Sequence, residues 1–329
     1  MNKIKIALPT GDPAGIGPEI CLKAALDPAV RTACDPILVC DADILERHAR
    51  LCGAKAELHV VEHVAKAKWI DGRINVLDCK APDAAIPIGA VSAAAGRASI
   101  AFCAAAVKAA MAREVDAVVA APQNETSIAQ AGIKFDGHPS FVARQTGTDE
   151  SGVYMMLCFG EMKISHVTLH RSVRQALSEI TRENVVRTIH ATDATLRQLG
   201  VGAPKIAVSG VNPHAGEGGL FGREEIEIIK PAIDAAAAEG LSVAGPFGAD
   251  TMFHMPGFDA FVVMLHDQGH IAAKLLARHA AAALTIGTPI LFSSVAHGSA
   301  HDIAGKGIAS PNAMIEALLH LAGAKRNAP

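Results

Sequence analysis

The sequence predicts an α/β fold whose sheet is mostly parallel. Short runs of Ala, Val, Ile and Leu alternate with longer segments of helical periodicity along the whole chain. Half of the 329 residues are hydrophobic, but aromatic residues make up only 4%. This mixture favours helices packed on a buried parallel sheet over an aromatic-rich β-sandwich. We find no internal repeat, low-complexity linker or charge block, so composition marks no domain boundary.

The first strand is predicted over the apolar run Ile4 to Leu8, which Pro9 and Gly11 close. A helix follows from Pro18, because proline is tolerated in the first helical turn. Further strands are predicted at residues 36–40, 116–121, 153–158, 163–168, 205–210 and 261–265, and further helices at residues 41–52, 93–113, 173–200, 224–239 and 311–322.

Charge and cysteine content narrow the class of protein. A net charge of −3 and a pI near 6.6 provide no basic field for nucleic acid or for a membrane surface. Seven scattered cysteines, an odd number without a C-x-x-C pair, are typical of reduced thiols in the cytoplasm. The apolar N-terminal stretch ends at Pro9, too early for a signal peptide. We therefore expect a soluble cytoplasmic protein without nucleic-acid or membrane partners.

Three histidines follow predicted strands, where α/β enzymes place their ligands: His170, His214 and His266. Neutral imidazoles bind zinc and other divalent ions, and three of them leave coordination positions open for a substrate. The alternative for any single histidine is a surface or hydrogen-bonding role. Two neighbours, His166 and His270, compete for the same assignment.

Two glycine-containing segments are candidate ligand loops. In residues 297–307, small residues allow close approach of backbone, while His297 and Asp302 offer an aromatic face and a hydrogen-bond acceptor. The alternative is a simple connector before the last helix. The opening loop, residues 11–19, lacks G-x-G-x-x-G, so it predicts either an anion site at a helix N-terminus or only a tight turn.

Two charged residues are weaker candidates. Lys274 lies eight residues after His266, where it serves as a proton shuttle, a carboxylate anchor or a solvated helix lysine. Asp250 is a candidate metal ligand or base, and the alternative is the N-cap of a following turn.

Together these segments resemble the 4-hydroxythreonine-4-phosphate dehydrogenase (PdxA) family, relatives of the isocitrate and isopropylmalate dehydrogenases. The matching segments run in order over essentially the whole chain: residues 11–19, Gly137-His138, His170, residues 212–217 and residues 266–269. Residues 297–307 resemble the adenosine-binding loop of the isopropylmalate dehydrogenases.

The resemblance implies a two-domain α/β protomer with an interdomain cleft and a homodimer partner that completes the active site. It implies a cofactor-side domain of residues 1–125 and 285–329 and a metal, substrate and dimerisation domain of residues 126–284. NAD is the implied hydride acceptor, and His170, His214 and His266 are the implied ligands of a divalent metal, which we expect to be zinc. The implied contacts to NAD are His297, Gly298, Ser299 and Asp302.

This chain departs from the family where phosphate is bound. It has Pro139, Ala283 and Phe292 where phosphate-using members carry Thr, Asn and Arg. Losing these groups removes hydrogen bonds worth about 1–3 kcal/mol each, so a phosphate dianion is poorly matched.

The segments around residues 139–140, 166–170, 269–271 and 293–295 resemble the terephthalate dihydrodiol dehydrogenase branch. That branch oxidises 1,2-dihydroxy-3,5-cyclohexadiene-1,4-dicarboxylate to protocatechuate with loss of carbon dioxide. We then expect Phe292 to stack on the substrate ring, with Lys274 and Asp250 as catalytic candidates and His138, Ser140 and Ser293 as polar contacts. The alternatives are a phosphorylated hydroxy-acid dehydrogenase and a non-catalytic metal- or ligand-binding protein.

Overall fold

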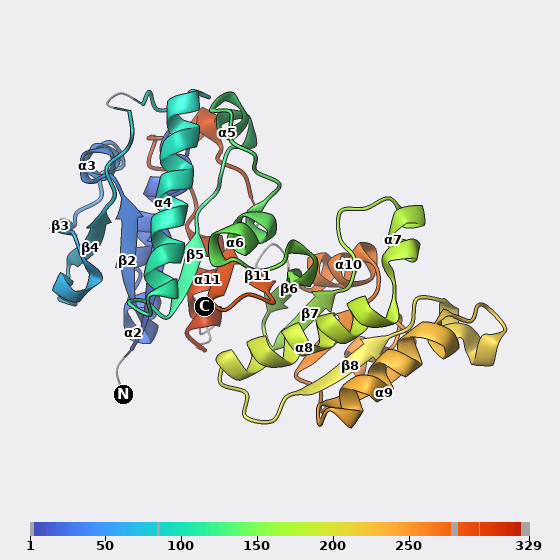
Figure 1. Cartoon of the computed structure of the whole chain (residues 1–329). Helices are drawn as coiled ribbons and strands as arrows, with labels where there is room; N and C mark the ends of the chain where they lie inside the picture. The colour runs from blue at the N-terminus through green and yellow to red at the C-terminus, as the bar shows by residue number, and fades with distance from the viewer. Residues whose placement is uncertain (1–2, 84–85, 278–281, 296, 324–329) are drawn as a thin grey trace. The chain divides into compact units, whose positions relative to one another are not determined.

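The computed structural model describes residues 3–83, 86–277, 282–295 and 297–323, and the chain divides into two units (Figure 1). Unit 1 comprises residues 1–147 and 289–329, and unit 2 comprises residues 148–288. The expected domain boundaries lie after residues 125 and 284 instead. The first boundary lies later in the chain than expected because α5 (Glu125–Gln130) and α6 (His138–Thr146) both pack on α4 (Ala93–Met111) of unit 1.

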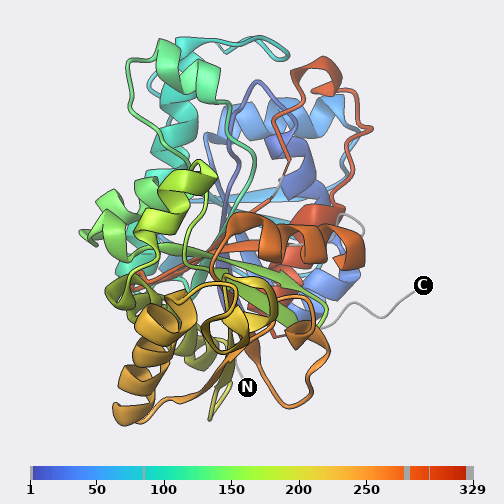
Figure 2. The same cartoon turned by 90° about the vertical axis from the view of Figure 1, so that its right-hand side faces the viewer.

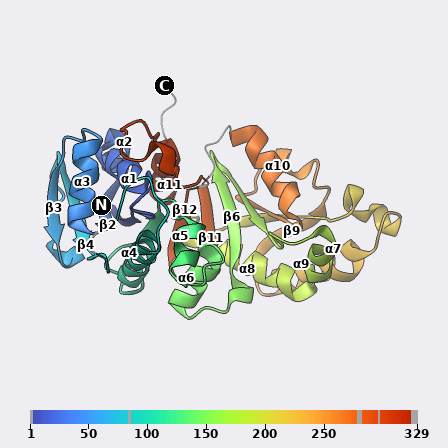
Figure 3. The same cartoon turned by 90° about the horizontal axis from the view of Figure 1, so that it is seen from above.

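The strands of unit 1 are all parallel to their neighbours. Their order is β3 (Glu57–Val61), β4 (Arg73–Asp78), β2 (Cys34–Cys40), β1 (Ile4–Pro9), β5 (Ala117–Ala120) and β12 (Leu291–Ser294). One face is covered by α4, α5 and α6 (Figure 3). The other is covered by α1 (Gly17–Leu26), α2 (Pro28–Ala33), α3 (Ala42–Leu51) and α11 (Asn312–Leu321).

Helix α4 forms the centre of the unit 1 core. It begins after Ser92, whose hydroxyl accepts a hydrogen bond from the Ala95 N–H, and its alanines allow close packing on β1, β2 and β5. Among the described residues it is the one helix long and apolar enough to cross a membrane, but more than half of it is buried inside the unit. Its composition is therefore that of a core helix.

Unit 2 has a mixed sheet of order β11 (Ala282–Ile286), β6 (Tyr154–Phe159), β7 (Met162–His166), β10 (Ala260–Val263), β8 (Lys205–Ser209) and β9 (Ser242–Phe247). Only the pairings of β6 with β11 and β7 are antiparallel. Helices α7 (Val173–Glu179), α8 (Arg182–Gln198) and α9 (Lys230–Ala238) lie on one side of the sheet and α10 (His266–Ala277) on the other (Figure 3). The prediction of an α/β fold with mostly parallel strands is confirmed.

Two long helices of the prediction are interrupted. The single helix predicted over residues 173–200 is wrong, because the chain leaves helical geometry at Ile180 and Thr181 then caps α8 by accepting a hydrogen bond from the Asn184 N–H. The helix at residues 224–239 begins as a π-helical turn, η4 (Glu225–Ile229). The remaining short 3-10 turns are η1 (Val64–Lys66), η2 (Glu150–Gly152), η3 (Pro213–Gly219), η5 (Met252–His254) and η6 (His301–Ile303).

All seven cysteines are free thiols. Five are buried, and burial raises the pKa of four of these, Cys34, Cys40, Cys103 and Cys158, to about 12. Such thiols stay protonated at neutral pH and pack as small apolar groups.

Candidate functional site

Two of the three predicted metal-ligating histidines lie side by side in unit 2. Strands β7 and β10 are parallel neighbours, so their carboxyl ends reach the same edge of the sheet. His170 lies in the loop after β7, and His266 begins α10 directly after β10. Their ring centroids are 5.6 Å apart. With metal–nitrogen bonds of about 2.0–2.1 Å, two imidazoles at this separation fit one ion.

A carboxylate fixes which ring nitrogen of His266 is free. The Nδ1 atom of His266 lies 2.7 Å from Asp267 Oδ1, and the Nδ1 atom of His214 lies 3.4 Å from Glu217 Oε2. The hydrogen bond to Asp267 places the proton on Nδ1 of His266, which leaves its Nε2 lone pair for a metal ion. Imidazoles whose second ring nitrogen is held by a carboxylate are typical ligands of zinc sites.

His214 lies apart from the other two. It stands in η3, where six consecutive residues, 214–219, have positive φ angles, three of them not glycine. Its side chain is 65% exposed, and its ring lies 6.1 Å from that of Phe221. Across the described part of the chain, no group of three or more His, Cys, Asp or Glu side chains is arranged to hold a metal ion. The structure therefore assembles two of the three predicted ligands.

A buried glutamate anchors the start of the His214 loop. The Glu225 carboxylate accepts hydrogen bonds from the N–H groups of Val211 and Asn212, both at 2.8 Å, and from Asn212 Nδ2 at 2.9 Å. Burial alone would raise the pKa of Glu225, but these hydrogen bonds outweigh it and lower the pKa. No motif in the sequence marks Glu225 for this role.

A stack of imidazoles supports His266. The His270 ring is parallel to that of His266 at 3.7 Å, and the buried His166 ring lies 4.7 Å from that of His270. Burial lowers the pKa of His166 to about 3 and the pKa of His270 to about 4, so both rings are neutral. The sequence signal was present in the four-residue spacing of His266 and His270, which places both on one helix face.

Lys274 and Asp250, the two predicted catalytic residues, are both exposed. Lys274 follows His270 by one turn of α10, and its charge contributes to the lowered pKa of His270. Asp250 lies in the loop after β9. The alternative role of Asp250 as an N-cap is wrong, since Thr251 precedes η5.

In unit 1, the predicted cofactor loop rests on the opening loop, as the red and blue segments of Figure 2 show. The Ile16 N–H donates to the Ser299 carbonyl at 2.9 Å, and His301 Nε2 lies 3.2 Å from the buried carboxylate of Asp12. A Cβ atom on Gly15 would stand 2.5 Å from the Ser299 carbonyl oxygen, so glycine is required there. Of the predicted NAD contacts, His297, Gly298 and Asp302 are exposed and Ser299 is buried.

A second carboxylate holds the far end of this loop. Glu19, fully buried in α1, accepts hydrogen bonds from the N–H groups of Gly307 and Ala309 and pairs with Lys23 at 2.7 Å. Burial would raise the pKa of Glu19, but its hydrogen bonds to Lys23, Cys52 and the backbone lower it. Sequence reasoning missed the supporting roles of Asp12, Glu19 and His301, because nothing in the spacing shows that two segments so distant in the chain meet.

The predicted substrate residues of unit 1 surround an aromatic corner. His138 begins α6, and its ring lies 5.4 Å from that of Phe292 on β12. Burial lowers the pKa of His138 to about 4, and its Nε2 atom is buried without a hydrogen-bond partner. Ser140 is half-buried on α6, and Ser293 is fully buried on β12.

The expected stacking of Phe292 on a substrate ring needs correction. The Phe292 side chain is 0% exposed and belongs to the core of unit 1, so it presents no free face. Its role is to support His138 from within the core. Ala283, the third replaced phosphate position, lies half-buried on β11 of unit 2.

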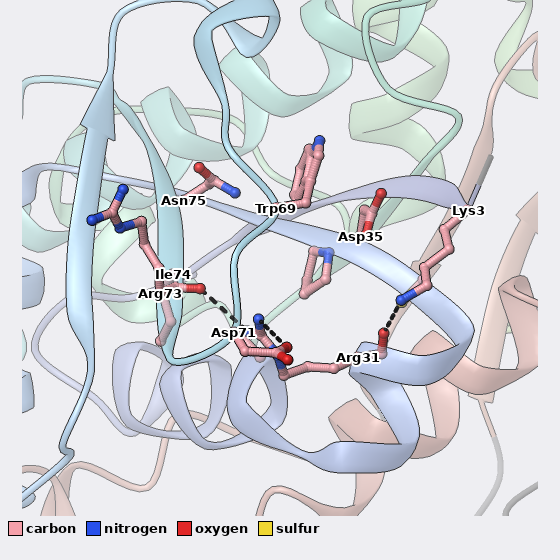
Figure 4. A pocket seen from close by; sticks show the side chains of 11 residues that line it. Lys3, Arg31, Asp35, Trp69, Asp71, Arg73, Ile74 and Asn75 are labelled. Atoms are coloured by element: carbon pink, nitrogen blue, oxygen red, sulfur yellow. Dashed lines mark hydrogen bonds and ion pairs between the residues drawn. The ribbon is translucent and has the colours of Figure 1, made fainter.

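A separate pocket lies at the opposite end of the unit 1 strands (Figure 4). Its lining comes from the starts of β1, β2 and β4 and includes Lys3, Asp35, Trp69 and Asn75. Its polar groups largely bind one another. For example, Arg31 donates to the backbone carbonyls of residues 70 and 73, and the Lys3 ammonium donates to that of residue 31. It is remote in the sheet from the loops that follow the strands.

Comparisons with known proteins agree on one family. The family model described as "Pyridoxal phosphate biosynthetic protein PdxA" matches residues 32–321. D-threonate 4-phosphate dehydrogenase of Cupriavidus necator is 40% identical over 317 residues, 95% of both chains. 1,2-Dihydroxy-3,5-cyclohexadiene-1,4-dicarboxylate dehydrogenase of a Comamonas species is 41% identical over 320 residues, 95% of this chain and 96% of the other.

Among solved structures, a 4-hydroxythreonine-4-phosphate dehydrogenase from Burkholderia phymatum matches with a TM-score of 0.92 at 37% identity. The match covers 99% of this chain and 100% of that one. These relatives act on different substrates at nearly equal identity, so similarity alone does not choose among them.

Proposed function

Because the chain belongs to the PdxA family of NAD-dependent decarboxylating dehydrogenases, we propose that it oxidises and decarboxylates a cis-dihydrodiol carboxylate. The substrate that fits best is 1,2-dihydroxy-3,5-cyclohexadiene-1,4-dicarboxylate, with protocatechuate as product. The family uses a divalent metal and NAD or NADP; we propose zinc and NAD for this chain. The reaction transfers a hydride to NAD and releases one carboxylate as carbon dioxide, which leaves an aromatic ring.

The observation that carries this proposal is the aromatic corner at the start of α6. His138 is neutral because burial lowers its pKa, and Pro139 beside it has no N–H to donate. The cations nearest in the sequence, Lys134 and Arg144, both pair with Asp136. A phosphate dianion needs several strong donors, and this corner offers an uncharged ring in their place.

We propose that His170, His214 and His266 hold the metal ion. The Nδ1 partner Asp267 supports this role for His266, since it leaves the Nε2 atom of that ring free. A bound divalent ion supplies Lewis-acid chemistry, lowering the pKa of a hydroxyl group and polarising its oxygen. His214 would have to approach the other two rings when the ion binds.

Lys274 is the proposed anchor for a substrate carboxylate, or the group that relays the hydroxyl proton and returns it to the ring oxygen. Lys274 follows His270 by four residues on α10, and its charge contributes to the lowered pKa of that histidine. Asp250 is the second candidate for the proton relay. A Lys274→Met variant separates the two roles of the lysine, because loss of an anchor raises KM and loss of a relay lowers kcat.

For NAD, we propose contacts from His297, Gly298, Ser299 and Asp302. Support comes from the backbone of this loop, which Asp12 and Glu19 hold in place from both ends. Exposed Asp302 is then free to accept hydrogen bonds from the adenosine half of the cofactor.

We also propose a homodimer in the cytoplasm. Unit 2 exposes large apolar side chains on α10, namely Ile271 at 57%, Leu275 at 75% and Leu276 at 59%. A second copy of the chain is the proposed cover for this surface. Light scattering of the purified protein tests the dimer, and Leu275→Asp is expected to shift it toward monomer. Location in the cytoplasm agrees with seven unpaired thiols.

The deciding experiment compares kcat/KM on one metal-loaded preparation, followed by absorbance at the NADH band. The substrates are the dihydrodiol dicarboxylate, D-threonate 4-phosphate and 4-hydroxythreonine-4-phosphate. We expect the dicarboxylate to give the highest value. Equal or faster turnover of a phosphorylated compound would overturn the substrate assignment, and no NADH with any compound would favour a non-catalytic ligand-binding protein.

A further inference from the structure

The first turn of α10 carries two histidines that act as one structural unit. His266 and His270 are four residues apart, so they lie on the same face of the helix. Their rings are stacked with centroids 3.7 Å apart and an angle of 9° between planes. His270 Nδ1 also lies 3.1 Å from the His266 carbonyl oxygen, which places the proton on Nδ1 of His270 and orients its ring.

A third histidine supports the pair from inside the sheet. His166, on β7, is 0% exposed, and its ring lies 4.7 Å from that of His270. A Cβ atom on Gly269 would stand 2.3 Å from His166 Nε2, so the glycine makes room for this ring under the helix. His166 Nε2 is buried without a hydrogen-bond partner. A buried unsatisfied nitrogen is costly, and an apolar side chain of similar size would avoid that cost.

We propose that His270, supported by His166, is a positioning residue that fixes the His266 ring for metal binding. The proposal rests on the proposed function, in which His266 is a metal ligand. Asp267 then holds the edge of the His266 ring through Nδ1, and His270 holds its face. A ring fixed on two sides loses little rotamer freedom when the ion binds, and this raises the affinity for the ion.

Simple packing of α10 on the sheet is the competing explanation. Packing requires a side chain of suitable volume at residue 270, whereas positioning requires a flat ring. His270→Leu keeps much of the volume and removes the ring, while His270→Phe keeps a ring that can stack. The two explanations therefore predict different orders of Zn²⁺ affinity for these variants.

The test measures metal affinity directly, without turnover. Apo-protein is titrated with Zn²⁺ against a chromophoric chelator, and the visible spectrum of Co²⁺ reports ligand geometry. We expect His270→Leu to weaken Zn²⁺ binding by about 10–100-fold and to change the Co²⁺ spectrum, as is typical when an outer-shell partner of a ligand is lost. His270→Phe is expected to recover most of the affinity. His190→Asn on α8 is the matched control, because His190 pairs with Glu239 at the surface.

The outcomes separate this inference from the proposed function. If wild-type protein binds Zn²⁺ and His270→Leu binds it equally well, the positioning role is wrong while the metal site stands. The same conclusion follows if His270→Phe is as weak as His270→Leu. If wild-type protein binds no divalent ion, or if His266→Ala binds it as well as wild type, the proposed metal site fails and this inference fails with it. Thermal unfolding of each apo-variant confirms that it is folded before titration.

Discussion

The cofactor loop of unit 1 and the His214 loop of unit 2 are held in opposite ways. In unit 1, buried carboxylates hold the loop at both ends, Asp12 through His301 and Glu19 through the N–H groups of residues 307 and 309. In unit 2, Glu225 holds only the start of the loop, and the six residues after Pro213 all have positive φ. The first loop is therefore held by the chain itself, whereas under our proposal the second completes its site only when an ion binds.

This difference matches the demands of the two ligands. A dinucleotide is bound through many weak contacts, so a preformed surface lowers the entropy cost of binding. A metal ion forms a few strong bonds, and these can compensate for ordering a strained loop. The two loops therefore predict that changes in unit 2 act on metal binding and changes in unit 1 act on stability and cofactor affinity.

The largest expected effect is on activity in unit 2. His214→Ala removes a proposed ligand from the strained loop, and we expect kcat/KM to fall by about three orders of magnitude, equivalent to about 4 kcal/mol of lost transition-state stabilisation. Steady-state kinetics with saturating NAD measure it. Surface His190→Ala is the control. Unchanged activity in His214→Ala would show that the loop contributes no ligand.

The next effect is on stability in unit 1. Glu19→Ala leaves Lys23 and two backbone N–H groups without their buried carboxylate, and we expect the free energy of unfolding to fall by about 3 kcal/mol. Urea denaturation measures the loss. Glu227→Ala, which breaks the exposed pair with Arg223, should cost no more than about 0.5 kcal/mol. Similar losses in the two variants would contradict the special role given to Glu19.

A smaller effect concerns the cofactor. Asp302→Ala should raise KM for NAD about tenfold, the equivalent of one hydrogen bond of about 1.4 kcal/mol, with little change in KM for the substrate. Initial rates at varied NAD give both constants. Asp234→Ala, an exposed carboxylate on α9, is the control. A change confined to KM for the substrate would contradict the proposed contact between Asp302 and NAD.

The smallest effect is the pH dependence of the His214 loop. The pKa of Glu225 is lower in the folded protein than its ordinary value of 4.5, so its stabilising effect is complete above that value and is lost as pH falls through the folded pKa. We expect amide exchange at residues 211–212, corrected for the intrinsic rate, to accelerate below pH 4.5. Glu225→Gln should lack this acid-dependent step. An identical profile in the variant would assign the step to another carboxylate.

Sequence periodicity located seven strands of the described part of the chain, each with a buried apolar run, and missed β3, β4, β9, β11 and β12. Strands β1, β2 and β5 consist of apolar runs and were predicted within a few residues. Strands β3 and β9 were missed because most of their residues are only partly buried, so their apolar pattern is weak. Helix α10 was missed because it begins with polar residues and contains Gly269, which has low helix propensity.

For the site, the sequence indicated which residues carry the chemistry but not what holds them. His170 and His266 were identified from their places after strands, and the sheet brings them together as parallel strands should. The stack with His270 depends on a glycine that admits His166, and the corner at His138 depends on the burial of Phe292. Such dependence is a property of packing between distant segments, so a single sequence does not show it.

The distribution of thiols allows a label to be attached to unit 2 through an introduced cysteine. Cys158 is the only cysteine of this unit, and it is buried, with its pKa raised to about 12 by burial. A maleimide reagent at neutral pH will therefore leave it intact, since alkylation requires an accessible thiolate. Leu220→Cys, at an exposed residue with a φ of −67°, would carry a fluorophore or spin label at the end of the His214 loop. Closure of that loop around an added ion can then be followed in real time, after Cys52 and Cys79, the two half-buried thiols of unit 1, are replaced by serine.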